Sequence, residues 1–150
     1  MRKGVRLGVD VGTVRVGVAR SDAEGLLAVP FDTYPRDTAL TAIAELVQEH
    51  SAIETIVGLP LGLSGSDTAS TRDAREFAQE LAHRTVSAVR MVDERLTSSQ
   101  AHQGFRQSGR SEKKRRPVID QAAAVILLQH ALDSERAQGV APGHLVDVTG

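Results

Sequence analysis

The chain has 150 residues, 41% hydrophobic and 25% charged, a composition typical of one compact soluble domain. It contains no cysteine, so disulfide bonds and thiolate metal sites are excluded and a cytoplasmic location is expected. The net charge is −1 and aromatic residues make up 3%, which argues against an overall basic surface and a base-stacking platform. No apolar stretch reaches membrane-spanning length, and we expect no membrane association.

The first part of the chain predicts three meandering strands. Residues 5–11 alternate apolar side chains with small or polar ones, and this period of two is typical of a strand. The alternation resumes at 14–19 after the Gly12-Thr13 turn, which indicates a β-hairpin. A third strand is expected over 26–34, where Pro30 makes it irregular or places it at an edge of the sheet.

The rest of the chain predicts alternating strands and helices. In chain order, the expected elements are a helix capped by Asp37, a strand at Thr55–Leu59, a Gly- and Ser-rich loop at Pro60–Asp67, a helix around 74–81, a strand at 87–92, a helix capped by Thr97 or Ser98 that ends near Gln107, and a final helix from Pro117 to Arg136. This order implies an α/β domain with a mixed five-stranded sheet and helices on both faces. We expect one domain over 1–136 and a loose C-terminal tail over 137–150.

Three acidic residues stand out because of where they lie in the predicted elements. Asp10 ends the first strand, Glu94 ends the last, and Asp120 lies near the start of the final helix. Burial of a lone carboxylate costs several kcal/mol unless a cation or hydrogen bonds compensate. Since ligands collect at the ends of central parallel strands, these positions are candidates for one shared site.

Small residues predict how the three acids could meet. Gly8, Gly17 and Ala19 leave one face of the hairpin almost bare, so the final helix could pack closely there and bring Asp120 beside Asp10. Carboxylates in one dry cleft repel each other unless divalent cations lie between them. Mg²⁺ and Mn²⁺ prefer oxygen ligands. Two such ions, about 3.5–4 Å apart, would activate a water molecule for hydrolysis of a phosphodiester bond.

Each acid also has a simpler structural interpretation. Asp10 could belong to an ordinary surface turn, and Glu94 could pair with Arg95 or lie in solvent. Asp120 could occupy a first helical turn because an acid is favourable there. Asp93 is as acidic as Glu94 and alternation places it on the opposite face, so which of the two binds metal stays open.

A basic segment precedes the last of these acids. Between Arg106 and Arg116 the chain has six basic residues and a single acid, Glu112. Such a cluster can bind the phosphate backbone of a nucleic acid, although a solvated charged loop is the alternative. Arg15 could hold a phosphate near the metal ions, and backbone N–H groups of the loop at Gly62–Ser66 could receive another.

Four segments in this order resemble the YqgF/RuvX family, and the resemblance covers residues 6–132. They are Asp10–Ala19 (DVGTVRVGVA), Ile56–Pro60 (IVGLP), Asp93–Thr97 (DERLT) and Val118–Ala124 (VIDQAAA). The resemblance implies an RNase H-like fold and a nuclease that matures the 5′ end of pre-16S ribosomal RNA during ribosome biogenesis. The family is also described as Holliday-junction-resolvase-like. It further implies that Asp10, Glu94 and Asp120 are the catalytic, metal-binding acids.

The candidate nucleic-acid-binding residues are polar or basic and flank these acids. They are Thr13, Arg15, Arg95, Arg110, Lys113, Lys114, Arg115 and Arg116. The segment Lys113–Pro117 departs from the family pattern, in which many relatives have Lys and Gly, and Pro117 stiffens the turn there.

Several functions are compatible with the sequence. The leading hypothesis is a nuclease dependent on Mg²⁺ or Mn²⁺, acting on structured RNA or on single-stranded or branched DNA. The alternatives are a junction-resolving DNA endonuclease in recombination or repair and a non-catalytic nucleic-acid-binding module. The segment Asp10–Thr13 could also be the phosphate loop of a sugar-kinase or actin-like ATPase, but those folds need two such domains and this chain has room for one. The sequence does not distinguish endonuclease from exonuclease action, or a homodimer from a monomer.

Overall fold

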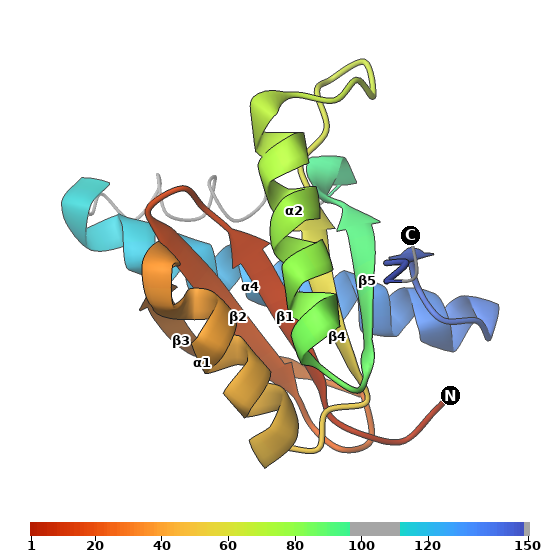
Figure 1. Ribbon diagram of the computed structural model, residues 1–150. Helices are drawn as coiled ribbons and strands as arrows, with labels where there is room; N and C mark the ends of the chain where they lie inside the picture. The colour runs from red at the N-terminus through yellow and green to blue at the C-terminus, as the bar shows by residue number, and fades with distance from the viewer. Residues whose placement is uncertain (97–111, 149–150) are drawn as a thin grey trace.

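A six-stranded mixed sheet forms the centre of the molecule, with the strand order β3-β2-β1-β4-β5-β6 (Figure 1). The computed structural model describes residues 1–96 and 112–148, and only the backbone at 96 and 112–120. In chain order the elements are β1 (Arg6–Val11), β2 (Arg15–Ser21), β3 (Ala28–Pro35), α1 (Arg36–Glu49), β4 (Glu54–Leu59), α2 (Ala69–Arg84), β5 (Ala88–Asp93), the 3₁₀ helix η1 (Glu94–Leu96), α4 (Glu112–Gln138) and β6 (His144–Leu145).

Three parallel strands form the middle of this sheet. Strand β1 pairs in parallel with β4, and β4 pairs in parallel with β5. The carboxyl ends of these three strands therefore lie at the same edge. Strands β2 and β3 extend the sheet beyond β1 as an antiparallel meander, and β6 adds an antiparallel strand beside β5.

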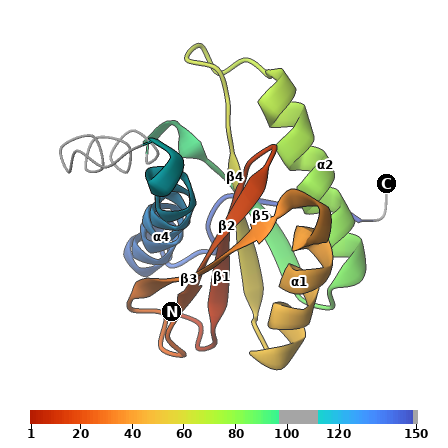
Figure 2. The same cartoon turned by 90° about the vertical axis from the view of Figure 1, so that its left-hand side faces the viewer.

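Helices cover both faces of the sheet (Figure 2). Helices α1 and α2 pack on one face, where Ile43 and Phe77 join a core with Leu7 and Val9 of β1. Helix α4 packs on the other face, in a second core that is built from Ala19, Ala28, Ile56, Val92, Ala124, Leu127, Leu128, Ala131 and Leu132. Because side chains alternate along a strand, Gly8 and Asp10 are on the α4 side of β1.

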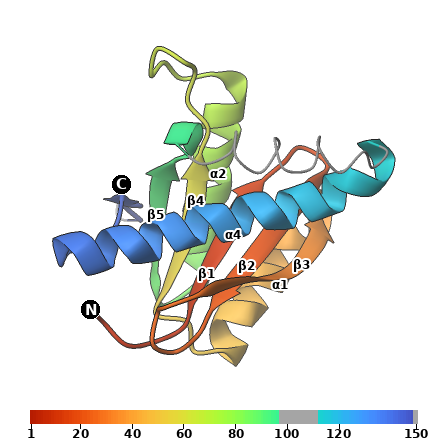
Figure 3. The same cartoon turned by 180° about the vertical axis from the view of Figure 1, so that it is seen from behind.

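Helix α4 crosses the sheet closely because Gly8 has no side chain (Figure 3). A Cβ atom at Gly8 would lie 2.8 Å from Cβ of Leu128 and 2.9 Å from the carbonyl oxygen of Ala124. The helix backbone thus touches the strand where the sequence predicts a bare hairpin face. The close approach sets the height of α4 above the strand that carries Asp10.

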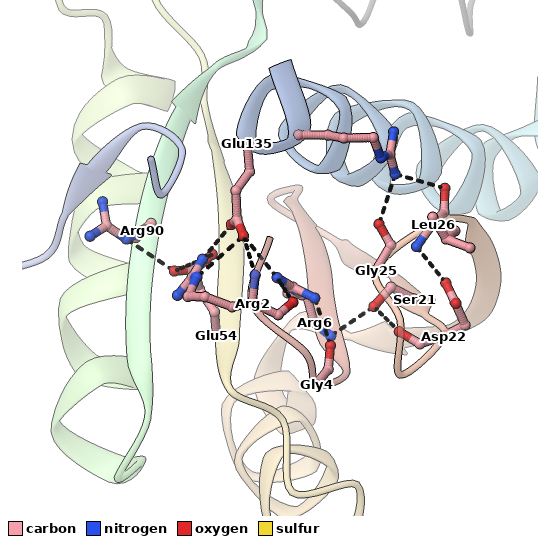
Figure 4. Close-up of polar contacts among 11 residues, drawn as sticks. Arg2, Gly4, Arg6, Ser21, Asp22, Gly25, Leu26, Glu54, Arg90 and Glu135 are labelled. Atoms are coloured by element: carbon pink, nitrogen blue, oxygen red, sulfur yellow. Dashed lines mark hydrogen bonds and ion pairs between the residues drawn. The ribbon is translucent and has the colours of Figure 1, made fainter. Parts of the chain in front are cut away.

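A buried charged cluster fastens the C-terminal half of α4 to the amino ends of the strands (Figure 4). Nη2 of Arg6 donates to Oε2 of Glu135 at 3.0 Å, and both side chains are at most 5% exposed. Arg2 bridges Glu135 and Glu54, and Nε of Arg90 lies 3.0 Å from Oε2 of Glu54. The cluster joins the N-terminal segment, three strands and α4 at the edge opposite to Asp10.

The predicted fold class is confirmed, with differences in several elements. The sheet has six strands rather than five, because β6 forms within the segment that is expected to be a loose tail. Helix α1 begins at Arg36 after Pro35, so Asp37 lies in its first turn and is not its cap. The helix expected from Thr97 or Ser98 to Gln107 lies outside the described residues.

Helix α4 begins earlier than predicted. It starts at Glu112 rather than Pro117, because the Glu, Lys and Arg residues before the proline are strong helix formers. Asp120 therefore lies more than two turns into the helix instead of in its first turn. Within the described parts of the chain, no helix is both long and apolar enough to pass through a membrane.

Candidate active site

Asp10 lies at the carboxyl end of β1, paired across the hairpin with Gly17. Asp10 and Arg15 are partly buried, whereas Thr13 in the turn between them is exposed. The turn is closed by the N–H of Gly12, which donates to the carbonyl of Arg15 at 2.9 Å. The ladder of the hairpin thus holds the backbone of Asp10, and the turn displays two of the predicted nucleic-acid-binding residues.

Glu94 follows β5 directly, and its side chain lies over Gly58 in the neighbouring strand β4. A Cβ atom at Gly58 would lie 2.7 Å from both Cγ and Cδ of Glu94. The side chain can occupy this space only because residue 58 is a glycine. The carboxylate of Glu94 is thereby directed from β5 across β4, toward β1.

The strand register brings Asp10 and Glu94 to the same place. Val9 pairs with Val57 in the parallel ladder, so Asp10 and Gly58 follow as neighbours on adjacent strands. Adjacent strands are about 4.8 Å apart. Since Gly8 and Ile56 both face α4, Asp10 and Gly58 face the same side. Asp10 and Glu94 therefore share one edge and one face of the sheet, separated by a strand without a side chain at that point.

The carboxylate of Asp93 is bound by Arg95. Nη2 of Arg95 lies 2.6 Å and Nε 2.9 Å from Oδ2 of Asp93, and the backbone N–H of Arg95 donates to Oδ1 at 2.9 Å. The side-chain hydrogen bond from Arg95 holds the pKa of Asp93 below its usual value. Arg95, which the sequence offers as a possible partner of Glu94, pairs with Asp93 in the structure.

The loop between β4 and α2 lies beside the ion pair of Asp93 and Arg95. A Cβ atom at Gly65 would lie 3.3 Å from Nη1 of Arg95. The loop is folded on itself, because the N–H of Gly62 donates to the carbonyl of Ser66 and the N–H of Gly65 to that of Gly62. Arg95 therefore lies between the strand ends and the Gly- and Ser-rich loop.

Asp120 is placed by the backbone of α4, and its side chain lies outside the described part. Contacts along the helix show its direction: Glu135 meets Arg6 at the start of β1, and Ala124 meets Gly8 two residues further on. Asp120 is one helical turn, about 5.4 Å, before Ala124 in α4. The side chain of its neighbour Gln121 donates to Oγ1 of Thr33 in β3 at 2.8 Å, and Thr33 is at the level of Asp10 in the sheet, because Thr33 pairs with Gly17 and Gly17 with Asp10.

The other predicted basic residues lie near the start of the same helix or outside the structure. Lys113, Lys114, Arg115 and Arg116 belong to the first turns of α4, and only their backbone is described. Arg110 lies outside the described residues.

Three residues that the sequence analysis did not single out shape this site. Gly58 makes room for Glu94, and a lone glycine inside a buried strand is a recognisable signal for such a close approach. Arg36 donates to the carbonyl of Gly12 and pairs with Asp73 of α2. No local pattern identifies this pair, because its members are distant in sequence and lie on different helices.

The chemistry of the donors fits a divalent cation of the Mg²⁺ type. Asp10 and Glu94 supply carboxylate oxygens on one face, which is the ligand type that hard cations prefer. Among the side chains that the structure describes, no group of three acids or histidines surrounds a common point. The third predicted ligand, Asp120, is not one of those side chains.

Comparison with known proteins places the chain in a family. The family model of RuvX, described as a Holliday junction resolvase, matches residues 4–134. The chain belongs to the RuvX family. A relative from Leifsonia xyli subsp. xyli, named "Putative pre-16S rRNA nuclease", is 55% identical over 150 residues, which cover 98% of this chain and 97% of the relative. A relative of the same name from Streptomyces avermitilis is 51% identical over 153 residues, with coverage of 99% and 97%.

Solved structures show the same fold for this RuvX-family protein. The RuvC protein of Thermus thermophilus, in complex with a Holliday junction substrate, matches with a TM-score of 0.60 at 15% identity, covering 95% of this chain and 99% of RuvC. A second structure of this RuvC matches with a TM-score of 0.58 at 16% identity, covering 94% and 99%. The predicted family and the predicted RNase H-like α/β fold are confirmed.

Proposed function

We propose that this RuvX-family protein is a divalent-metal-dependent nuclease that processes the 5′ end of pre-16S ribosomal RNA. The observation that carries the proposal is the position of Glu94, whose carboxylate crosses the side-chain-free Gly58 toward Asp10. Two carboxylates on one edge and one face of a sheet repel each other, and a divalent cation between them relieves this repulsion. The names of the relatives supply the substrate.

In this proposal Asp10, Glu94 and Asp120 hold Mg²⁺ or Mn²⁺, as two ions. When bound, the ions supply Lewis-acid activation of a water molecule and stabilisation of the leaving oxygen. Glu94 is favoured over Asp93 as the second ligand, because Arg95 already occupies the carboxylate of Asp93. The helical position of Asp120, one turn from the contact between Ala124 and Gly8, supports its membership of the site.

The remaining residues of the site bind the nucleic acid. Thr13 lies in the turn that follows β1, and Arg15 closes this turn at the start of β2, where both can contact the phosphate next to the cleaved bond. Arg95 lies beside the glycine-rich loop and would contact the phosphate backbone of the nucleic acid on the β5 side of the site. The basic start of α4, with Arg110 before it, extends the contact beyond Asp120. Each phosphate contact of this kind contributes a salt-dependent, sequence-independent part of the affinity.

The domain boundaries, the location in the cell and a second candidate function follow from the same assignment. We assign residues 1–136 to the nuclease domain and residues 137–150 to a C-terminal tail, from which β6 joins the sheet beside β5. A role on ribosomal RNA precursors would require a cytoplasmic location. The second candidate is a DNA endonuclease acting on four-way junctions, which the description of the RuvX family favours. Symmetric cleavage of a junction needs two active sites, so this candidate requires a homodimer.

The test uses the purified full chain with three substrates: an RNA carrying the 5′ precursor of 16S RNA, single-stranded DNA and a four-way DNA junction. We expect cleavage of the RNA at the precursor end with Mn²⁺ or Mg²⁺ and none with EDTA. Asp10→Asn, Glu94→Gln and Asp120→Asn should each reduce cleavage at least about 100-fold, because several kcal/mol of transition-state stabilisation is lost.

The circular dichroism spectrum and unfolding midpoint of each variant provide the control for folding. Full cleavage by any of the three variants would refute the assignment of the site. Preferred cleavage of the junction by a dimer would select the second candidate. Binding without hydrolysis, with every substrate and metal, would select a non-catalytic binding module instead.

A further inference from the structure

Arg36, the first residue of α1, joins three separate segments. Nη1 of its guanidinium donates to the carbonyl of Gly12 at 2.9 Å. Nη1 and Nη2 also donate to the two carboxylate oxygens of Asp73 in α2, at 2.7 and 2.8 Å. The same guanidinium lies 5.2 Å from the centre of the Phe77 ring. One side chain thus connects the turn after β1 to two helices.

Arg36 contacts this turn through its backbone as well as through its side chain. The ladder between β1 and β2 includes the pairs Asp10–Gly17 and Val11–Val16, and the turn follows Val11. The N–H of Gly12 closes the turn by donating to the carbonyl of Arg15. The backbone N–H of Arg36 also contacts the turn by donating to the carbonyl of Val14 at 2.9 Å, and its guanidinium adds the bond to Gly12.

Asp73 keeps the guanidinium of Arg36 in this position. The hydrogen bond to Asp73 raises the pKa of Arg36, and the bond from Arg36 lowers the pKa of Asp73, so both groups are charged. The planar fork of arginine matches a carboxylate with two parallel bonds while one N–H also reaches Gly12. A lysine ammonium has no such fork and cannot reproduce this geometry.

We propose that Arg36 is a positioning residue for nucleic-acid binding. Held by Asp73, its guanidinium fixes the turn that presents Thr13 and Arg15 to a phosphate of the substrate. Asp10 depends less on this contact, because its backbone belongs to the strand ladder. The inference rests on the proposed function, since it assigns Thr13 and Arg15 to the nucleic-acid contact.

The test compares Arg36→Lys and Arg36→Ala with Arg84→Ala. Arg84 is a matched control, because its Nη1 also links α2 to α1, at 3.3 Å from Oγ1 of Thr41. Arg84→Ala changes the net charge by the same amount as Arg36→Ala. Binding of the pre-16S RNA is measured with Ca²⁺ in place of Mn²⁺, and cleavage is measured with Mn²⁺. Amide hydrogen exchange of residues 9–16 reports on the turn without any substrate.

For both Arg36 variants we expect Kd and KM for the RNA to rise about three- to tenfold, the effect of losing one or two hydrogen bonds. The kcat and the half-saturating Mn²⁺ concentration should remain near the wild-type values. Exchange should become faster in the turn and stay unchanged at Val9 and Asp10. Arg84→Ala should alter neither binding nor exchange in the turn.

The outcomes separate this proposal from the proposed function. Unchanged RNA affinity and unchanged exchange in both Arg36 variants, beside a wild type that binds, would overturn the positioning role alone. A loss of kcat with unchanged KM would also overturn it, because Arg36 would then act on the catalytic acids. Failure of the wild type to bind any nucleic acid would overturn both proposals together.

Discussion

Glu94 lies against the backbone of Gly58, with Cγ and Cδ each 2.7 Å from the point where a Cβ atom of residue 58 would stand. Gly58 belongs to β4, whereas Glu94 begins η1 directly after β5, and β4 lies between β5 and β1. A single missing side chain therefore opens the path along which the carboxylate of Glu94 reaches the Asp10 side of the sheet. The site therefore depends on the lack of a side chain at Gly58 as much as on the acids.

We expect Gly58→Ala to displace Glu94 and to weaken metal binding about 10- to 100-fold, as a change in the support of a metal ligand does. The measurement is the Mn²⁺ concentration that gives half-maximal cleavage. Ile56→Val, on the same strand and the same face, is the control: it should lower stability by about 1 kcal/mol without changing the Mn²⁺ dependence. Equal Mn²⁺ dependence in Gly58→Ala and wild type would contradict the role of Gly58.

Asp93→Asn separates the two adjacent acids. Because Arg95 already holds the carboxylate of Asp93, this variant should keep its Mn²⁺ dependence within about twofold of wild type, whereas the loss of a metal ligand costs far more. Isothermal titration of Mn²⁺ into Asp93→Asn and Glu94→Gln measures the difference directly. If Asp93→Asn were the variant that lost binding, Asp93 would replace Glu94 as the ligand.

Glu135→Ala should destabilise the fold by about 3–5 kcal/mol, because it leaves the charge of Arg6 buried without this partner. Urea unfolding measures the change. Asp133→Ala removes an acid from the same helix, but Asp133 is exposed and pairs with the exposed Arg136, so a change within about 0.5 kcal/mol is expected. Similar losses in both variants would show that the buried cluster has no special role.

Acid should weaken the fold through the same cluster. Burial acts to raise the pKa of Glu135, but the hydrogen bonds and charges of Arg2 and Arg6 outweigh it and hold the pKa below its usual value. A carboxyl with a lower pKa in the folded chain stabilises the fold above its unfolded pKa, for which the reference value is 4.5, and this contribution is lost as the pH falls further. Urea midpoints between pH 7 and pH 3 should therefore fall less steeply in Glu135→Gln than in wild type. Parallel curves would contradict this linkage.

Patterns along the chain predict those parts of the structure that depend on neighbouring residues. Alternation identifies β1 and β2, and it places Gly8 and Asp10 on one face. The bare face at Gly8 predicts the close approach of the last helix. The sequence does not predict strand β6, because two residues are too few for a periodic pattern and its pairing with β5 is a tertiary contact.

The shape of the site is harder to predict than its acids. The candidate acids stand out in the sequence because Asp10 and Glu94 follow apolar strands and Asp120 precedes an apolar helical run. The support of Arg36 by Asp73, in contrast, joins residues on two helices and leaves no local pattern. The start of α4 shows a competition between two local rules. Pro117 indicates a first turn, whereas the preceding Glu, Lys and Arg residues favour a helix, and the helix extends through them.

The most direct measurement is the anomalous diffraction of Mn²⁺ in crystals of the full chain. We expect Mn²⁺ peaks at the carboxyl edge of β1 and β4, within coordination distance, about 2.0–2.3 Å, of oxygens of Asp10, Glu94 and Asp120. Crystals of Glu94→Gln should lose or weaken these peaks. Mn²⁺ bound elsewhere in a chain that cleaves RNA, or Asp120 directed away from Asp10 and Glu94, would contradict the shared metal site.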